Sequence, residues 1–306
     1  MDNQEDVIKE LFTIGDYVRW GSSLFASSGL TFGHGTDNAM DEAFAIVRYV
    51  LHLPHNIPPY MISSRLTLSE RQAAVKLLSE RVSTRKPMPY LTNEAWFCGL
   101  SFYVDERVLI PRSPIAELVE SGFEPWVDSS DMHTVLDLCT GSGCIAIATA
   151  AMFPGVTVVA TDISSDALDV AADNVARHKV ESQVTLVASD LFANLPSTEK
   201  FDVIVTNPPY VDAEDMAGLS EEFKHEPQGA LAAGIDGLDL VRQILRNAGD
   251  YLTDHGLLVV EVGNSYKAIL SQFPQVPFIW PEFDRGGHGV FVLTKQALME
   301  NQAHFL

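Results

Sequence analysis

Cysteine is scarce in this sequence. Only three cysteines occur among 306 residues, at Cys98, Cys139 and Cys144, and they form no Cys-x-x-Cys pair. An odd number without paired spacing indicates neither a disulfide framework nor a zinc site. We therefore expect free thiols that serve as small buried apolar side chains, as in a cytosolic protein.

Long apolar runs are absent as well. No stretch approaches the ~20 residues that a membrane-spanning helix needs. The first residues, MDNQEDVIKELF, are acidic and lack the basic-then-apolar order of a signal peptide. These features predict a cytoplasmic protein with no membrane partner.

Basic residues are few. Twenty Lys and Arg stand against 41 Asp and Glu, which gives a formal net charge of −21, and no Lys/Arg cluster occurs. Such a surface repels phosphate backbones, so we expect no stable nucleic-acid binding. The charge leaves two interpretations open: it keeps the protein soluble, or it attracts a basic partner. The nine histidines have no metal-ligand spacing, so no metal is expected.

The hydrophobic pattern of the sequence changes near residue 90, which predicts a separate helical domain over residues 1–90. A second domain is natural because 306 residues exceed what one compact core usually holds. Ser69 before Glu70 fits one helix start, and Asp41 with Glu42 fits another. Apolar residues recur at helical spacing in 5–30, 40–53 and 69–85.

A stiff segment, KPMPYL (86–91), ends the helical pattern. The residues after it, AWFCGLSFYVDERVLIP, read as short strands. We therefore predict a linking hairpin over residues 91–110 and a larger domain over residues 111–306.

From residue 132 onward, short apolar strands alternate with helical stretches. Strands that read as continuous apolar runs and are separated by helices indicate a parallel sheet covered on both faces. The fold class is therefore predicted as α/β with a doubly wound sheet. The strand candidates are 134–138, 156–162, 184–188, 201–206, 256–262 and 289–294, and the helical stretches are IAIATAAMF, SDALDVAADNVARHK and GLDLVRQILRNAGDYL.

The first strands of this sheet end in residues that suit a nucleotide. Gly141 and Gly143 let the backbone approach a ligand, and the helix after them aims its free amides at a carboxylate or phosphate. Asp162 ends the second strand, where a carboxylate can accept hydrogen bonds from a ribose diol. Asp190 and Leu191 follow the third strand and suit the amino group and the face of an adenine.

The glycine loop by itself leaves alternatives open. Gly141-x-Gly143-x-x-Ala146 fits a tight structural turn and also the dinucleotide fingerprint of a nicotinamide enzyme. Asp162 favours nucleotide binding over a plain turn. It does not choose between a dinucleotide and S-adenosylmethionine.

The motif Asn207-Pro208-Pro209-Tyr210, which follows the fourth strand, makes that choice. The carboxamide of Asn207 can accept one N–H of a planar –NH2 group, and the carbonyl of Pro208 can accept the other. The prolines hold both acceptors in place, because each fixes its own φ. Tyr210 can lie against the planar group. Such a site orients an amide or an exocyclic amine toward a methyl donor.

These motifs together resemble the class I, Rossmann-like S-adenosylmethionine-dependent methyltransferases that modify nitrogen atoms. VLIPRSP (108–114), Glu226-Pro227 and EVG (261–263), with the N-terminal helices and the hairpin, extend the resemblance over the whole chain to the HemK family of protein-glutamine N5-methyltransferases. The resemblance implies methyl transfer from S-adenosylmethionine to a glutamine side-chain amide. It implies that the cofactor contacts Asp137, Cys139, Thr140, Gly141, Ser142, Gly143, Asp162, Asp190, Leu191 and Asn207.

Two branches of this family differ after the hairpin. Pro111-Arg112-Ser113-Pro114 departs from the P-R-P-x-T-E pattern of the release-factor branch. GHGTDNAMDEA (33–43) and PYLTNEAWFCG (89–99) instead resemble the branch that methylates large-subunit ribosomal protein three. That resemblance implies a basic ribosomal protein as partner, residues 1–90 as a docking domain, and closure of the VLIPR segment near the methyl group.

Other functions stay open at this point. A release-factor glutamine methyltransferase would use the same chemistry on another protein. A DNA adenine-N6 methyltransferase also uses an Asn-Pro-Pro-Tyr loop, but it needs a basic groove to hold a flipped base. An NAD-dependent dehydrogenase or a non-catalytic binding module would show a different cofactor preference.

Overall fold

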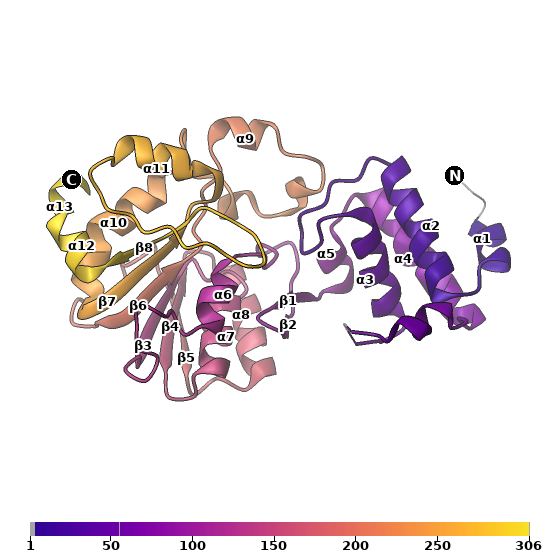
Figure 1. The fold of residues 1–306 in the computed structure, drawn as a ribbon, viewed down its shortest axis with the longest axis horizontal. Coiled ribbons are helices and arrows are strands. Elements are labelled where there is room, and N and C mark those ends of the chain that lie inside the picture. Colours follow the sequence, from indigo (N-terminus) through magenta and orange to yellow (C-terminus); the bar gives the residue numbers. More distant parts are fainter. Residues whose placement is uncertain (1–3, 55, 306) are drawn as a thin grey trace. The chain divides into compact units, whose positions relative to one another are not determined.

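The computed structural model describes residues 4–54 and 56–305 and divides the chain into two compact units. The first unit consists of Met1–Glu94 together with Ser220–His225, and the second consists of Ala95–Leu219 together with Glu226–Leu306. We call them the helical unit and the sheet unit (Figure 1). The hairpin strands predicted as a linker belong to the sheet unit.

The helical unit follows the predicted helices with three local differences. The pattern over 5–30 is interrupted at Thr13, whose side chain caps a second helix in a capping box with Asp16. The helix predicted to start at Ser69 is capped two residues earlier, by Thr67. The segment KPMPYL contains the start of a short helix. The elements are α1 (Gln4–Glu10), α2 (Ile14–Ser27), α3 (Ala39–Val50), η1 (Pro59–Ser63), α4 (Leu68–Thr84) and α5 (Met88–Thr92).

The core of the helical unit lies among α2, α3 and α4, which pack on one another (Figure 1). Tyr17 and Phe25 of α2, Ile46 of α3 and Leu78 of α4 are fully buried. Each helix contributes one apolar face, as amphipathic helices of a small domain do.

A segment from far along the sequence completes the helical unit. Within Ser220–His225, the buried carboxylate of Glu222 accepts a hydrogen bond from the Thr31 amide at 3.0 Å. The guanidinium of Arg85 pairs with the same carboxylate at 2.9 Å. The rings of Phe223 and His34 are in contact at a tilt of 46°, with 4.2 Å between their centroids.

A second buried ion pair adjoins the first. The Nε of Arg81 donates to Glu42 at 2.5 Å, and neither side chain is exposed. Arg81 also faces Glu222 at 3.7 Å and donates to the Thr31 carbonyl at 3.1 Å. We call Glu42, Arg81, Arg85 and Glu222 the buried ionic cluster.

The sheet unit contains a small hairpin and one large sheet. The hairpin strands are β1 (Ala95–Phe97) and β2 (Leu100–Phe102), which pair antiparallel. The large sheet has the order β5-β4-β3-β6-β7-β8. Its strands are β3 (Thr134–Leu138), β4 (Thr157–Asp162), β5 (Val184–Ala188), β6 (Phe201–Thr206), β7 (Leu252–Glu261) and β8 (Val290–Thr294).

All six predicted strands of the large sheet are confirmed, but the sheet is mixed and not wholly parallel. β8 runs antiparallel to β7, because the chain enters β8 at the edge where β7 ends: the last residue of β7, Glu261, pairs with the first of β8, Val290. The connection from β5 to β6, residues 189–200, consists of turns and contains no helix.

The three predicted helices of this unit are present, as α7 (Cys144–Met152), α8 (Ser165–His178) and α10 (Asp239–Tyr251). No helix in the described part of the chain is long and apolar enough to cross a bilayer. The other helices are α6 (Ile115–Glu120), α9 (Ala213–Ala217), α11 (Tyr266–Gln272), α12 (Lys295–Glu300) and α13 (Gln302–Phe305). The short 3₁₀ turns in this part of the sequence are η2 (Phe223–His225), η3 (Gln228–Ala230) and η4 (Gly263–Ser265).

Two apolar layers sandwich the large sheet. On β3, Val135 points into the layer that includes Ile147 of α7, while Leu136 points into the layer that includes Ile244 of α10. This alternation follows from the pleat of a strand. Figure 1 shows α7 and α8 on one side of the sheet and α10 and α12 on the other. The carboxyl ends of β3 to β6 therefore stay free of the helical layers.

Candidate functional site

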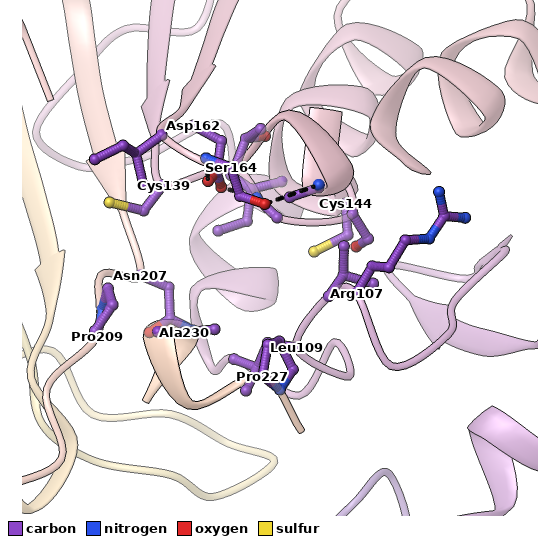
Figure 2. A pocket seen from close by; sticks show the side chains of 18 of the residues that line it. Arg107, Leu109, Cys139, Cys144, Asp162, Ser164, Asn207, Pro209, Pro227 and Ala230 are labelled. Carbon is purple, nitrogen blue, oxygen red and sulfur yellow. Dashed lines mark hydrogen bonds between the residues drawn. The ribbon is translucent and has the colours of Figure 1, made fainter. Parts of the chain in front are cut away.

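A cavity of about 380 Å³ lies at the carboxyl ends of β3, β4, β5 and β6, wholly within the sheet unit. Its volume is within the ~300–1,000 Å³ of ordinary small-molecule sites. Figure 2 shows Asp162 and Ser164 on one side of the cavity, with Asn207, Pro227 and Ala230 on the opposite side. Of the predicted site residues, the wall contains Cys139, Thr140, Gly141, Ser142, Asp162, Asp190, Leu191, Asn207 and Pro209.

The two glycines after β3 have different surroundings. Both have positive φ, +55° at Gly141 and +79° at Gly143. A Cβ at Gly141 would meet no described atom within 4 Å and would project into open space beside the cavity. A Cβ at Gly143 would lie 3.1 Å from Ile147 and 3.3 Å from Ala171. Gly141 therefore leaves room for a ligand, whereas Gly143 permits close packing of α7 on α8.

A matched pair of substitutions separates these two roles. Alanine at either position adds roughly 1–2 kcal/mol of backbone strain, because both positions are left-handed. We expect Gly141→Ala to weaken binding of the cofactor by about 10-fold or more, since its methyl group enters the ligand space. Gly143→Ala should instead lower the free energy of unfolding by about 2–3 kcal/mol. Calorimetric titration and urea unfolding measure the two effects; equal losses of affinity in both variants would contradict this assignment.

The carboxylate of Asp162 is fixed by two backbone amides. The amide of Ser164 donates to Oδ1 and the amide of Gly141 donates to Oδ2, each at 2.9 Å (Figure 2). Burial raises the pKa of this carboxyl above its ordinary value. A carboxylate has about four acceptor positions, so each oxygen can still accept a hydroxyl from a ligand.

Asp137 lies behind the cavity wall. Its Oδ2 accepts hydrogen bonds from the Thr140 hydroxyl at 2.6 Å and from the Ala146 amide at 3.1 Å, which ties the glycine loop to β3. The side chain is fully buried, and burial raises its pKa to about 7. Among the described residues, its Oδ1 has no hydrogen-bond partner.

The cysteines differ from the prediction of small buried side chains. All three are free but only partly buried, and Cys139 and Cys144 contribute to the cavity wall. Burial raises the pKa of both of these thiols, so they remain protonated at neutral pH. Beside them, the buried Oγ of Ser142 has no partner within the described part of the chain. This side of the cavity therefore offers thiols and one free hydroxyl.

The Asn-Pro-Pro-Tyr loop is split between the cavity and the protein interior. Asn207 lines the cavity, and its buried Oδ1 accepts no hydrogen bond from any described residue. Pro209 also lines the cavity, whereas Pro208 is buried and Tyr210 is not part of the wall. The Tyr210 hydroxyl donates to Glu261 at 2.9 Å. The loop thus presents one unpaired acceptor to the cavity and anchors itself through the phenol.

A further wall closes the cavity opposite Asp162. The sequence indicated its residues only in part. Arg107 to Ser113 contribute six lining residues, so the VLIPR segment borders the cavity. Arg112 donates to both oxygens of the buried Glu226, at 2.5 and 2.8 Å, and the Ile110 amide donates to the same group at 3.1 Å. This pair joins the segment to the lining residue Pro227.

Several lining residues have no signal of their own in the sequence. Ile163 lines the cavity although 74% of its surface is exposed. The Glu226-Pro227 motif points to the neighbourhood of Gly229 and Ala230, but not to the cavity itself. The residues that sequence reasoning missed include Ile163, Ser164, Ala167, Leu240, Gly229 and Ala230.

Comparison with known proteins gives close relatives over nearly the full chain. Residues 125–275 match the family model "Methyltransferase small domain". A ribosomal protein uL3 glutamine methyltransferase from Francisella tularensis is 45% identical over 303 residues, which cover 99% of this chain and 96% of that protein. An enzyme of the same name from Xanthomonas campestris is 48% identical over 294 residues, which cover 96% of this chain and 95% of that protein.

Among solved structures, the catalytic domain of hMettl16 in complex with MAT2A 3'UTR hairpin 6 is similar in fold. The TM-score is 0.50 at 17% identity, and the match covers 78% of this chain and 86% of that one. At this level of identity the likeness concerns the fold, which is that of a methyltransferase.

Proposed function

The chain belongs to the ribosomal protein uL3 glutamine methyltransferase family, and from this premise we propose that it transfers a methyl group from S-adenosylmethionine to the side-chain amide nitrogen of a glutamine in uL3. The observation that carries the proposal is Asn207 Oδ1, a buried acceptor at the cavity to which no residue in the described part of the chain donates. We also propose that the reaction takes place in the cytoplasm.

The cavity residues fit S-adenosylmethionine, which supplies a methyl group activated by a positively charged sulfur. Asp162 would hold the ribose diol, and Asp190 with Leu191 would hold the adenine. The unpartnered Ser142 hydroxyl and the open space at Gly141 are the features that a bound ligand would use. Asp137 would act through the loop, by holding Thr140 and Ala146 in place.

Asn207 and Pro208 would orient the glutamine amide. Its nitrogen is a weak nucleophile, because the lone pair is delocalised into the carbonyl. Two hydrogen bonds from the amide N–H groups, one to Asn207 Oδ1 and one to the Pro208 carbonyl, would increase electron density on nitrogen. Most of the acceleration would come from position, since well-held reactants reach effective molarities of ~10⁵–10⁸ M.

The distribution of charge supports a basic partner. The sheet unit contains 28 of the 41 acidic residues but only 10 of the 20 basic ones, a net charge of −18. The helical unit has a net charge of −3. The unit that holds the cavity would therefore attract a basic protein over a distance. Docking contacts of the helical unit would be short-range.

Labelled methyl transfer tests the proposed function directly. Purified uL3, a release factor and duplex DNA are each incubated with the enzyme and labelled S-adenosylmethionine, and the products are resolved by mass spectrometry. We expect the label on one glutamine of uL3, and we expect Gln→Ala at that position to abolish labelling. Preferential labelling of the release factor or of adenine in DNA would refute the assignment.

Salt dependence tests the role of the charge. The Debye length falls from ~10 Å at 0.1 M to ~3 Å at 1 M ionic strength, so steering by the acidic surface weakens as salt rises. We expect kcat/KM for uL3 to fall across this range. A short neutral peptide that contains the same glutamine should be a poorer substrate with little salt dependence. If uL3 and the peptide respond alike, long-range attraction is not what brings the substrate to the enzyme.

A further inference from the structure

Glu261 is a buried acid that the proposed chemistry does not use. It is the last residue of β7, and only 5% of its surface is exposed. Oε1 accepts the hydroxyl of Tyr210 at 2.9 Å, and Oε2 accepts the hydroxyl of Ser113 in a short hydrogen bond. Both of its oxygens are therefore committed to side chains of loops that surround the cavity.

The two hydroxyl groups come from two different segments that contribute lining residues to the cavity, although Tyr210 itself does not line it. Ser113 lines the cavity at the end of the Arg107–Ser113 segment. Tyr210 closes the Asn-Pro-Pro-Tyr loop, three residues after Asn207. These partners lie 148 and 51 residues away from Glu261 in the sequence. One carboxylate thus joins the two segments between which the glutamine amide would enter.

Each hydroxyl group is oriented as a donor to the carboxylate. The Ser113 oxygen already accepts the Ile115 amide at 3.1 Å, which leaves its proton for Glu261. Two O–H donors match an ionised carboxylate, which only accepts. Burial raises the pKa of Glu261, and the two hydrogen bonds oppose that rise.

The ring of Tyr210 is held at two further points. Its backbone carbonyl accepts the Ser265 hydroxyl at 2.8 Å. The ring lies so close to Gly263 that a Cβ there would be 2.5 Å from Cε2. Together with these contacts, the hydrogen bond to Glu261 fixes the position of the phenol oxygen and so the direction in which the ring points.

We propose that Glu261 is a positioning residue for methyl transfer, which fixes the Tyr210 ring and the Ser113 wall so that the glutamine amide meets the methyl group in line. This inference rests on the proposed function, because it assigns a role in that reaction. Glu261 is not among the residues that line the cavity, so it would act through the two side chains it holds, Tyr210 and Ser113. Displacement of a reacting group by about 1 Å can cost ~10²-fold in rate.

The test is a double-mutant cycle with Glu261→Gln and Tyr210→Phe. Glutamine keeps the shape of Glu261 but replaces one acceptor by a donor. We expect Glu261→Gln to lower kcat on uL3 by about 10²-fold. The dissociation constant of S-adenosylhomocysteine should stay unchanged. In the Tyr210→Phe background, Glu261→Gln should lower kcat by a clearly smaller factor, since only its bond to Ser113 is then left to lose.

Two controls separate positioning from folding. Glu181→Gln makes the same chemical change at an exposed site in the same unit and should leave kcat unchanged. Urea unfolding gives the folded fraction of each variant. If kcat per folded molecule is unchanged in Glu261→Gln, or if its effect is equally large with and without the Tyr210 hydroxyl, the inference is overturned.

A readout without turnover distinguishes failure of this inference from failure of the proposed function. Absence of uL3 methylation by the wild-type enzyme would refute the function. In that case, NMR spectra of the protein with labelled tyrosine test whether Glu261 positions the Tyr210 ring. The Tyr210 ring signal, identified by its loss in Tyr210→Phe, should shift in Glu261→Gln, and the other seven tyrosines should not. An unshifted Tyr210 signal would refute the positioning role.

Discussion

Asn207→Ala is expected to lower kcat by about 10²–10³-fold, the usual cost of losing one preorganised polar group at a reacting centre. The Oδ1 atom of Asn207 is buried at the cavity and accepts no hydrogen bond from the described residues. This acceptor is therefore available to a ligand in the cavity. Alanine removes this acceptor and leaves the backbone of the loop, including the Pro208 carbonyl, in place. Single-turnover rates with bound S-adenosylmethionine measure the loss.

A contrasting substitution on the other side of the cavity serves as the control. Asp162→Ala removes the carboxylate that two backbone amides hold in place. We expect this variant chiefly to raise the dissociation constant of the cofactor, which calorimetry measures. Near-normal turnover in Asn207→Ala would exclude the Asn-Pro-Pro-Tyr loop from the chemistry, whatever the result for Asp162.

Arg81→Met is expected to have the largest effect on stability and to lower the free energy of unfolding by about 3–5 kcal/mol. The reason is that it removes one partner of a buried ion pair and leaves the other charge buried. Arg81 is fully buried and donates to Glu42 at 2.5 Å. Without it, the one side-chain hydrogen bond left to the Glu42 carboxylate within the described residues is that from the Thr36 hydroxyl at 3.0 Å. Urea unfolding measures the loss, and hydrogen exchange of α3 and α4 shows whether it lies in the helical unit.

Two further variants test the cause. Lys9→Met breaks an exposed pair with Glu5, in which both side chains are mostly exposed, and should cost only about 0–1 kcal/mol. Replacing Glu42 by Gln together with Arg81→Met removes the isolated charge and should restore part of the loss. If Lys9→Met and Arg81→Met cost the same, burial of the charge is not what makes Arg81 important.

The strands could be predicted because their residues are buried on both faces. Such segments read as continuous apolar runs, and the end of each run fixes which residue lies at the carboxyl edge of the sheet. Asp162 and Asn207 were placed in this way, and the structure brings both to one cavity. The direction of β8 could not be predicted, since an apolar run has the same pattern in either orientation.

Contacts between charged or polar side chains that lie far apart along the chain could not be predicted from the sequence. Glu261 was recognised only as part of a motif, since nothing local marks Tyr210 or Ser113 as its partners. Arg81 and Glu222 likewise lie on segments without a shared pattern. The break after α1 was missed for another reason: the capping box at Thr13 outweighs an apolar spacing that continues through it.

The return of Ser220–His225 to the helical unit has a consequence for how such a protein could evolve. The chain crosses between its two units three times, after Glu94, after Leu219 and after His225. Recombination at one breakpoint would transfer residues 1–94 without Glu222, the carboxylate that Arg85 contacts. The helical unit is therefore not an exchangeable module. Any transfer that keeps the unit whole would have to carry both pieces of the chain together.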